Sequence, residues 1–564
     1  MASELTAHEL IAKHRPTLDQ ALEAIRTRAY WSPHPEHPKA YGEHGSLDAE
    51  AGKAAFEALL GNRLDLTDQP GIDDWVGGEV SPYGIELGVT YPRADLDTLL
   101  PAMKAGQRAW RDAGAEVRAV VCLEILKRIS DRTHQFAHAV MHTSGQAFMM
   151  AFQAGGPHAQ DRGLEAVAYA YVEQVRTPDT AEWTKPQGKR DPLALTKQFT
   201  PVPRGTALVI GCNTFPTWNG YPGLFASLAT GNAVLVKPHP RAVLPLALTV
   251  RIARDVLAEA GFDPNLVALT AERPGEGIAK ALAVRPEIRI IDYTGSTAFG
   301  DWLEASARQA QVYTEKAGVN TVIVESAGNY KGMLSNLAFS LSLYSGQMCT
   351  TPQNLLIPRD GIRTDEGPKT FDEVVADLAR AVDGLLGDDA RANALLGAIV
   401  NPDVKARLEA AAGLGEVALA SREIANPEFP GAVVRTPVIV KLDGAKPDDE
   451  AAYMSECFGP VSFAVAVDSA ADAVELLRRT VREKGAMTVG AYTTDEDVER
   501  AIEEVCLEEA AQLSLNLTGG VYVNQTAAFS DFHGSGGNPA ANAALCDGAF
   551  VANRFRVVEV RRES

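Results

Sequence analysis

A single cysteine and an upstream glutamate provide the residue types needed for covalent chemistry on a carbonyl group. Cys349 lies in Tyr344-Ser-Gly-Gln-Met-Cys-Thr-Thr-Pro352, between a stretch with helical spacing and the strand-like run 353–357. Glu315 lies upstream in Thr314-Glu-Lys-Ala-Gly318. A thiol can attack a carbonyl carbon, and a carboxylate can act as the base. Because most buried cysteines are inert, this pair is a hypothesis that needs support from other segments.

The loop after the apolar run 233–236 is a candidate contact for a nucleotide. It contains Lys237, His239 and Arg241. Cationic side chains at the end of a buried strand can reach a ribose or a phosphate. A lysine that merely ends a strand is the alternative, and the residue types alone leave both interpretations open.

The segment 294–300 is a second candidate nucleotide contact. Gly295 and Ser296 follow the apolar run 288–291 and open a helical segment. Free backbone N–H groups at a helix start favour an anion such as a pyrophosphate. Ser296 could equally be a plain helix cap. The chain contains neither a GxGxxG sequence nor a Walker sequence, so the usual nucleotide fingerprints are missing.

Alternating apolar runs and amphipathic segments predict the fold class. Between residues 205 and 325 this alternation indicates a parallel sheet covered on both faces, a doubly wound α/β domain. Residues 326 to about 530 alternate in the same way and predict a second α/β unit. Because ligands bind at the carboxyl ends of parallel strands, we expect a site at the loops 211–218, 237–241 and 292–297.

Composition and cysteine spacing exclude several classes of function. The chain has 564 residues, 46% of them hydrophobic, and a net charge of −20, which argues against binding to nucleic acid or acidic membranes. The six cysteines form no CxxC pair, so we predict neither a disulfide framework nor a metal site. No signal peptide or membrane-length apolar stretch is visible, and we expect a cytoplasmic protein. The Pro/His-rich segment 31–38 is interpreted as a solvated loop.

Taken together, the order of these segments resembles the aldehyde dehydrogenase superfamily over roughly residues 100–561. The matching motifs are Thr143-Ser-Gly-Gln146, Phe215-Pro216, Lys237-Pro238, Gly295-Ser-Thr297, Glu315, Gly346-Gln-Met-Cys349 and Glu456-Cys-Phe-Gly-Pro460. Each motif is weak alone, whereas their order and the interval from Glu315 to Cys349 are specific. The resemblance implies a cofactor domain, a catalytic domain and an oligomerisation arm. We therefore expect a mostly helical extension at 1–60 and a dinucleotide-binding domain at 61–185 with 205–325. We expect the catalytic domain at 326–535 and the oligomerisation arm at 186–204 with 540–564.

The resemblance also implies a mechanism. Cys349 would attack the aldehyde carbon, hydride would pass to a nicotinamide, and Glu315 would activate the water that hydrolyses the thioester. Glu456 and Phe458 match positions that hold the nicotinamide ribose and ring. The family's oxyanion asparagine usually precedes Phe-Pro, where this chain has Thr214; we expect Asn213, one residue earlier, to serve instead, with Thr214 as the alternative.

The coenzyme and the substrate follow from finer features of the same resemblance. NAD-selective relatives often place a glutamate where this chain has Pro240, flanked by His239 and Arg241, so we predict NADP, with NAD as the alternative. Phe215-Pro-Thr-Trp218 and the segment 532–537 resemble dehydrogenases that oxidise CoA-linked semialdehydes in aromatic catabolism, including phenylacetate degradation. Within the latter segment, His533 is interpreted either as a substrate contact or as a turn-stabilising residue. The alternatives are a CoA-acylating enzyme and a catalytically silent scaffold, and we expect a homodimer or homotetramer.

Overall fold

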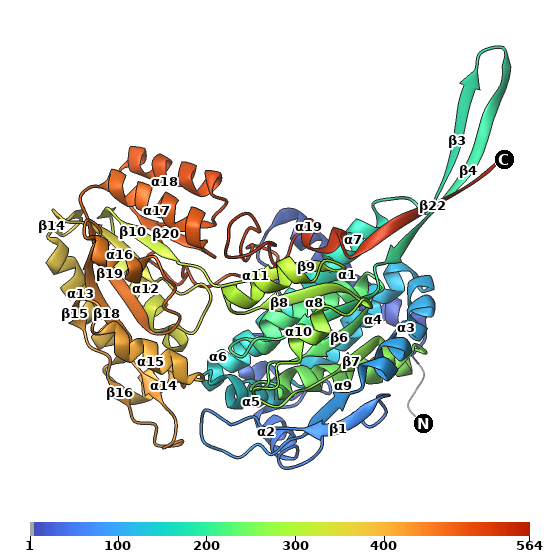
Figure 1. Cartoon of the computed structure of the whole chain (residues 1–564), viewed down its shortest axis with the longest axis horizontal. Coiled ribbons are helices and arrows are strands. Elements are labelled where there is room, and N and C mark those ends of the chain that lie inside the picture. Colours follow the sequence, from blue (N-terminus) through green and yellow to red (C-terminus); the bar gives the residue numbers. More distant parts are fainter. Residues whose placement is uncertain (1–4, 564) are drawn as a thin grey trace.

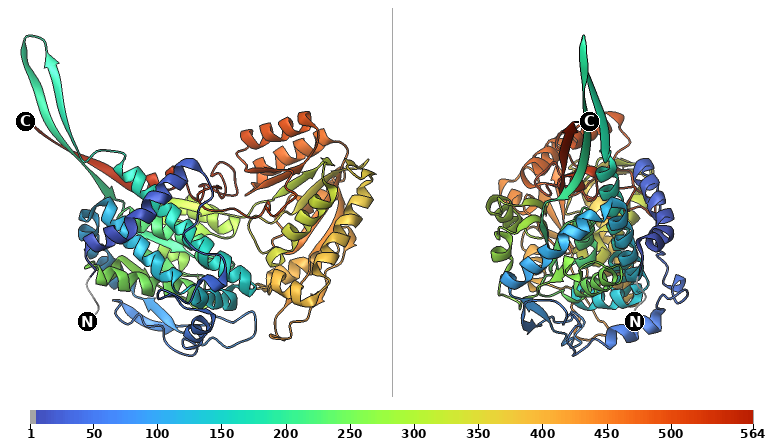
Figure 2. Two further views of the ribbon diagram at one scale, coloured as in Figure 1. Left: turned by 180° about the vertical axis from the view of Figure 1, so that it is seen from behind. Right: turned by 90° about the vertical axis from the view of Figure 1, so that its right-hand side faces the viewer.

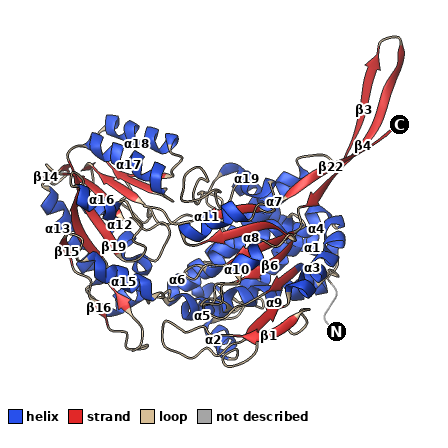
Figure 3. Ribbon diagram, in the orientation of Figure 1, coloured by secondary structure: helices blue, strands red, loops and turns tan. Residues whose placement is uncertain are grey.

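A computed structural model describes residues 5–563 as two lobes and a projecting arm (Figure 1). Each lobe is built on one large sheet with helices packed against it, as the secondary-structure colouring shows (Figure 3). The expected α/β class is confirmed. None of the helices in the described part of the chain combines the length and the apolar character needed to cross a bilayer.

The first lobe contains a five-stranded parallel sheet in the doubly wound order. Its strands, in spatial order, are β7 (Val267–Leu269), β6 (Ala233–Lys237), β5 (Thr206–Ile210), β8 (Ile288–Thr294) and β9 (Gln311–Glu315). The chain winds outward on both sides of the β5–β8 pair, which makes that pair the point where the strand order reverses. Ligands bind outside the carboxyl ends of the strands at such a point.

Helices on both faces bury this sheet. Those that contact its strands are α3 (Leu96–Asp112), α8 (Pro216–Ala229), α9 (Leu244–Glu259), α10 (Ala279–Ala283) and α11 (Thr297–Ser306). Helices α4 (Gly114–Ser130), α5 (Thr133–Ser144), α6 (Phe148–Gln153) and α7 (Ala159–Val175) pack against these helices or against one another. Every residue of β5 and β6 is buried, which is why both strands read as continuous apolar runs.

The second lobe contains a seven-stranded sheet that is parallel except at one edge. Its order is β15 (Glu416–Leu419), β18 (Val438–Asp443), β19 (Val461–Val467), β12 (Asn354–Pro358), β10 (Thr321–Val324), β20 (Val489–Tyr492) and β21 (Leu513–Leu515), with β15 antiparallel. Along β10, Val322 and Val324 pack with α12 (Tyr330–Ser342) and α13 (Phe371–Leu386). Ile323 points to the opposite face, toward α17 (Ala470–Lys484) and α18 (Glu496–Glu508).

Three strands form the arm, which stands clear of both lobes in the side views (Figure 2). They are β3 (Thr180–Gln187), β4 (Arg190–Pro203) and β22 (Phe555–Glu563), in the order β22-β4-β3. The sequence predicted a connector over 175–195 and a strand only over 195–200. The connector is instead the turn and outer strand of a hairpin, and Gly188 supplies the positive φ of its two-residue turn.

The N-terminal extension packs against the first lobe. Helix α1 (Ala7–Thr27) buries Leu10 and Leu18, and α2 (Ala49–Glu57) lies against α5. The solvated-loop interpretation of 31–38 is wrong for His34, which is buried and lies 2.6 Å from the Asp161 carboxylate through Nδ1. The sequence offered no cue to this partner, because Asp161 is distant along the chain.

A buried ion pair fixes the start of the C-terminal strand to the first sheet. Arg554 immediately precedes β22 and is fully buried. Its guanidinium donates to both carboxylate oxygens of Asp292 on β8, at 2.6 and 2.7 Å, and to Ser227 Oγ at 2.7 Å. A guanidinium left without its counter-charge in such a place is strongly destabilising.

We therefore expect Asp292→Asn to reduce the free energy of unfolding by about 3 to 5 kcal/mol, measured by denaturant unfolding. Asp497→Asn is the matched control, because Asp497 pairs with Arg500 at the surface. In this variant the free energy of unfolding should fall by less than about 1 kcal/mol. Equal losses for the two variants would contradict the assigned role of the Arg554–Asp292 pair.

Candidate active site

The backbone that connects helix α12 to Cys349 has strained dihedral angles. Tyr344, Ser345 and Gly346 have positive φ angles of 53°, 49° and 62°. At Gly346 an added Cβ atom would lie 2.3 Å from the carbonyl oxygen of Gly459, so only glycine fits. Such backbone persists only where the surroundings enforce it, and it often marks functional sites.

Asn320 holds the Cys349 turn from the neighbouring strand. It precedes β10, is buried, and donates through Nδ2 to the carbonyl oxygens of Cys349 at 2.8 Å and Thr351 at 3.0 Å. Its Oδ1 accepts the backbone N–H groups of Met487 and Thr488. One buried amide therefore ties together the loops that enter β12, β10 and β20.

Glu315 ends strand β9 and lies beside Cys349, as the sequence-based pairing requires. Its side chain is buried, and Asn219 Nδ2 donates to its Oε2 at 2.9 Å. Asn219 comes from the first turns of α8, and sequence reasoning missed it. The signal that could have found it is its position directly after Phe215-Pro-Thr-Trp218, a segment already singled out.

His533 lies between the thiol and the carboxylate. Its Nε2 is 3.6 Å from Cys349 Sγ and 3.1 Å from Glu315 Oε1. The indole of Trp218 packs edge-on against the imidazole, with ring centroids 4.6 Å apart. The sequence left His533 open between a substrate contact and a turn residue; in the structure it contacts both candidate catalytic groups.

Burial and mutual charge determine the protonation of this group. Burial raises the pKa of the Cys349 thiol well above its ordinary value, and the adjacent Glu315 carboxylate raises it further. Burial also pushes the pKa of Glu315 upward, but the charge of His533 and its hydrogen bond pull it below its ordinary value. The carboxylate is thus ionised, and the thiolate is disfavoured unless a positive charge is close.

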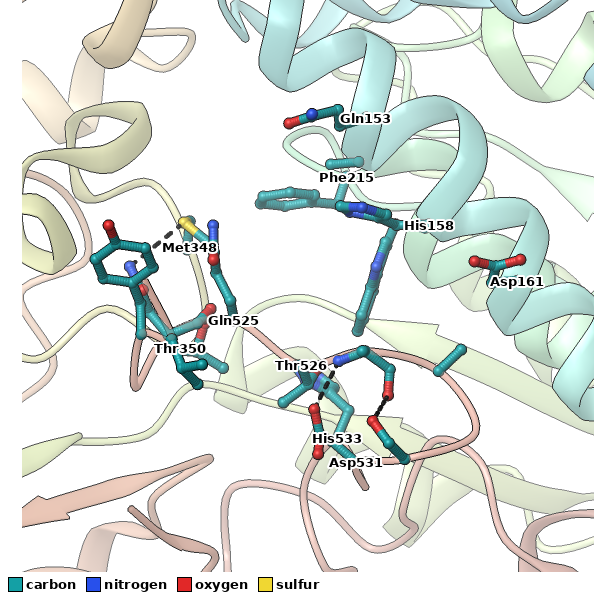
Figure 4. Close-up of a pocket in the computed structure, with 18 of the residues that line it drawn as sticks. Gln153, His158, Asp161, Phe215, Met348, Thr350, Gln525, Thr526, Asp531 and His533 are labelled. Carbon is teal, nitrogen blue, oxygen red and sulfur yellow. Dashed lines mark hydrogen bonds between the residues drawn. The ribbon is translucent and has the colours of Figure 1, made fainter. Parts of the chain in front are cut away.

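A cavity of about 560 Å³ opens onto Cys349 from one side. In Figure 4, His533 and Asp531 lie at one end, Met348 and Thr350 line one wall, and Gln153, His158 and Asp161 face them from the helices. The N-terminal extension completes the wall with Tyr30, Trp31 and Glu36. The aromatic lining residues are Tyr30, Trp31, Phe215, Trp218 and Tyr522.

Two further cavities lie near the thiol, and one of them is lined by Cys349. A small one of about 20 Å³ is lined by Cys349, Glu456 and Phe458. A larger one of about 340 Å³ lies beyond it, shares Phe458, and is bordered by His239 and Arg241 at the carboxyl end of β6. Phe458 lines both cavities and so links the thiol to the carboxyl edge of the doubly wound sheet.

Glu456 and Phe458, predicted to hold the nicotinamide end of the coenzyme, line the small cavity beside the thiol. Burial raises the pKa of Glu456 to about 7. Lys237 is less accessible than the sequence suggested. The Lys237 ammonium is buried in an ion pair with Glu272, a residue that sequence reasoning missed. Burial lowers the pKa of His239 to about 4, so its ring is neutral at pH 7.

Gly295 and Asn213, two further predicted site residues, already make hydrogen bonds within the protein. Gly295 and Ser296 do follow β8 and open α11, but the Gly295 N–H already donates to the Glu315 carbonyl oxygen at 3.0 Å. Asn213 lines neither of the two cavities that include Cys349: its Nδ2 donates to the Thr143 carbonyl at 3.1 Å, and it borders the 340 Å³ cavity together with Thr214. The asparagines in the 560 Å³ cavity that opens onto Cys349 are Asn219 and Asn524.

The comparison with known protein families agrees with this geometry. A sequence model of the aldehyde dehydrogenase family matches residues 89–545. The chain belongs to the aldehyde dehydrogenase family. It is similar to a solved "NAD-dependent aldehyde dehydrogenase" from Burkholderia multivorans, with 56% identity, a TM-score of 0.95, and coverage of 98% of this chain and 99% of that one.

Curated relatives are more distant. A benzaldehyde dehydrogenase [NAD(+)] from Pseudomonas putida is 25% identical over 388 residues, covering 68% of this chain and 73% of the relative. A vanillin dehydrogenase from an Amycolatopsis species is 27% identical over 421 residues, covering 73% and 79%. The chain is thus an aldehyde dehydrogenase, an oxidoreductase.

The position of Cys349 between the two spaces leads to a test. We expect Cys349→Ala to abolish release of reduced coenzyme with any aldehyde, because the nucleophile is lost. Cys457→Ala is the matched control: Cys457 lines the same small cavity, but no hydrogen bond links its thiol to Glu315 or His533 among the described contacts. Absorbance at the wavelength of reduced nicotinamide measures both. Loss of activity in Cys457→Ala alone would reverse the assignment.

Proposed function

We propose that this enzyme oxidises an uncharged aromatic aldehyde to the carboxylic acid, with NAD as the hydride acceptor. One observation carries the proposal: the Cys349 thiol lies where an aromatic-lined cavity meets the coenzyme-side space, with Glu315 and His533 in reach. An aldehyde and a nicotinamide could therefore approach the same sulfur through different cavities.

In this mechanism Cys349 attacks the aldehyde carbon and becomes acylated after oxidation. Glu315, held by Asn219, is placed to take a proton from the water that hydrolyses the thioester. The backbone N–H of Cys349 is a candidate donor to the oxyanion, a contribution of a few kcal/mol at the transition state. For Asn213 to donate to the oxyanion, its hydrogen bond to the Thr143 carbonyl would have to break on substrate binding.

A bound nicotinamide coenzyme would supply the hydride acceptor. Glu456 and Phe458 would hold its nicotinamide end, because both line the small cavity beside the thiol. The loops after β5 and β6, with Asn213, His239 and Arg241, would hold its nucleotide end. Gly295 and Ser296 stay candidates for the phosphates, since they lie at the same edge of the sheet.

The charges near β6 favour NAD over the NADP predicted from sequence. A 2′-phosphate needs nearby cations, yet Lys237 is neutralised by Glu272 and His239 is uncharged at pH 7. Arg241 is then the one remaining cation of the three predicted contacts. The 56% identical protein from Burkholderia multivorans is described as NAD-dependent, which supports the same preference for NAD.

We expect kcat/KM and the binding constant, measured by calorimetry without aldehyde, to favour NAD over NADP by at least about tenfold. Glu272→Gln should narrow that ratio, because it frees the charge of Lys237. Glu276→Gln, a nearby carboxylate paired with surface arginines, is the control that should leave the ratio unchanged. Tighter binding of NADP by the wild type would contradict the proposal.

The lining of the substrate cavity favours an uncharged aromatic substrate. Its described lining includes five aromatic side chains and the carboxylates of Glu36, Asp161 and Asp531, but no lysine or arginine. Glu36 and Asp161 pair with histidines, whereas Asp531 accepts a backbone N–H from Ala527. An anionic substrate would meet like charge here. The names of the benzaldehyde and vanillin dehydrogenases point to the same aldehyde class.

Matched aldehydes test this directly. We expect kcat/KM for benzaldehyde to exceed that for 4-carboxybenzaldehyde by about tenfold or more, because only the latter carries a carboxylate into the cavity. Asp531→Asn should reduce the difference, and Asp497→Asn at the distant surface should not. Equal turnover of the two aldehydes by the wild type would contradict the proposal that the carboxylates of the cavity repel an anionic substrate.

A CoA-linked semialdehyde is the second candidate. The segments Phe215-Pro-Thr-Trp218 and 532–537 support it, because they resemble the phenylacetic acid degradation protein PaaN. The absence of cations in the described lining weighs against the phosphates of CoA. Retention of Glu315 favours water over CoA as acyl acceptor, and assembly of three reactive side chains favours an enzyme over a silent scaffold.

We also propose a homodimer or homotetramer joined through the arm. Leu193, Val557, Val558 and Val560 expose apolar surface there, and both edge strands of the β22-β4-β3 sheet are unpaired within the described chain. A second copy could cover this surface by adding strands.

A further inference from the structure

One imidazole nitrogen, His533 Nε2, faces both the Cys349 thiol and the Glu315 carboxylate. Two adjacent buried anions are unfavourable unless a positive charge lies beside them. His533 Nε2 lies 3.6 Å from Cys349 Sγ and 3.1 Å from Glu315 Oε1, and the three donor atoms lie within 4.8 Å of one another. In the tautomer that carries its hydrogen on Nδ1, the lone pair of Nε2 can accept the thiol proton, and the Nε2–H bond that forms can point at both groups. The arrangement is a nucleophile, a base and an orienting carboxylate, each from a different segment.

We propose that His533 is a catalytic residue that takes the proton of the Cys349 thiol. The Sγ–H bond breaks, the proton forms the Nε2–H bond, and the electron pair stays on sulfur. The step consumes no co-reactant and leaves the total charge unchanged. The resulting imidazolium lies between the thiolate and the Glu315 carboxylate and offsets the repulsion between them. This inference rests on the proposed function only in taking Cys349 as the nucleophile.

The geometry favours His533 over Glu315 as the acceptor. Glu315 Oε2 is already held by Asn219 at 2.9 Å, so this carboxylate is oriented and stabilised as an anion. A carboxylate is in general a weaker base toward a thiol than an imidazole is, and the lowered pKa of Glu315 belongs to the state in which His533 carries the proton. Glu315 is then kept for orienting the imidazolium and for the later proton transfer from water.

The surroundings position the ring without supplying another base. Trp218 packs edge-on against it, and Arg162 of α7 lies over that indole, 5.3 Å from the ring centroid. Arg162 is itself paired with Glu165 at 2.7 Å. The other titratable groups nearby are Cys212, whose pKa burial raises to about 12, and Asp531, two residues before His533.

Alkylation of Cys349 by iodoacetamide between pH 5 and 10 tests the proposal, with neither coenzyme nor aldehyde present. Peptide mass spectrometry measures the rate at Cys349 and, as an internal control, at Cys457. Burial and Glu315 raise the pKa of the Cys349 thiol, so a midpoint of the rate profile below the ordinary thiol pKa of about 8.5 requires the paired imidazolium; this is the result we expect in the wild type. In His533→Gln that midpoint should rise by at least about one unit, with an approximately tenfold slower reaction at pH 7.

A rescue experiment separates proton transfer from a structural role. The cavity of about 560 Å³ reaches His533, so added imidazole should restore alkylation of Cys349 in His533→Ala by several fold. Exposed His44→Gln is the control and should keep the wild-type profile. An unchanged midpoint in His533→Gln, or a wild-type midpoint at or above that of a free thiol, would overturn the proposal. Neither result depends on the substrate or the coenzyme.

Discussion

The site depends on placing a thiol and a carboxylate side by side, away from water. Burial disfavours the charged form of both, and each charge disfavours the other. Two contacts relieve this conflict for Glu315: the amide of Asn219 and the imidazole of His533. The surrounding fold can be understood as the means of bringing these groups together and holding them there.

Three distant parts of the chain supply the three reactive groups. Glu315 ends β9 of the first sheet, Cys349 precedes β12 of the second, and His533 belongs to the C-terminal loop that returns toward the first lobe. That return is anchored by the Arg554–Asp292 ion pair at the start of β22. Because the pair is buried and fully hydrogen-bonded, it fixes the path of the segment after His533 as well as the arm.

The two sheets present opposite edges to the site. In the first lobe the coenzyme-side loops follow their strands, as the doubly wound arrangement predicts. In the second lobe Asn320, Cys349, Glu456 and Phe458 all precede theirs. In the proposed mechanism the coenzyme would therefore extend from the carboxyl edge of one sheet to the amino edge of the other. The N-terminal extension contributes to the substrate side through Trp31, which packs on Phe529.

Much of the fold was readable in the sequence, since buried parallel strands such as β5 and β6 are continuous apolar runs and the segments between them have helical spacing. The pairing of Cys349 with Glu315 also followed from residue types and from the resemblance to the family, whereas Glu456 and Phe458 followed from the resemblance alone. The arm hairpin and the burial of His34 did not, because their partners are distant along the chain. Nor did Glu272, Asn219 or the central position of His533. Local sequence determines which residues can do chemistry and which strands are buried; only tertiary packing decides which charges meet, and so which of those residues are neutralised, oriented or able to move a proton.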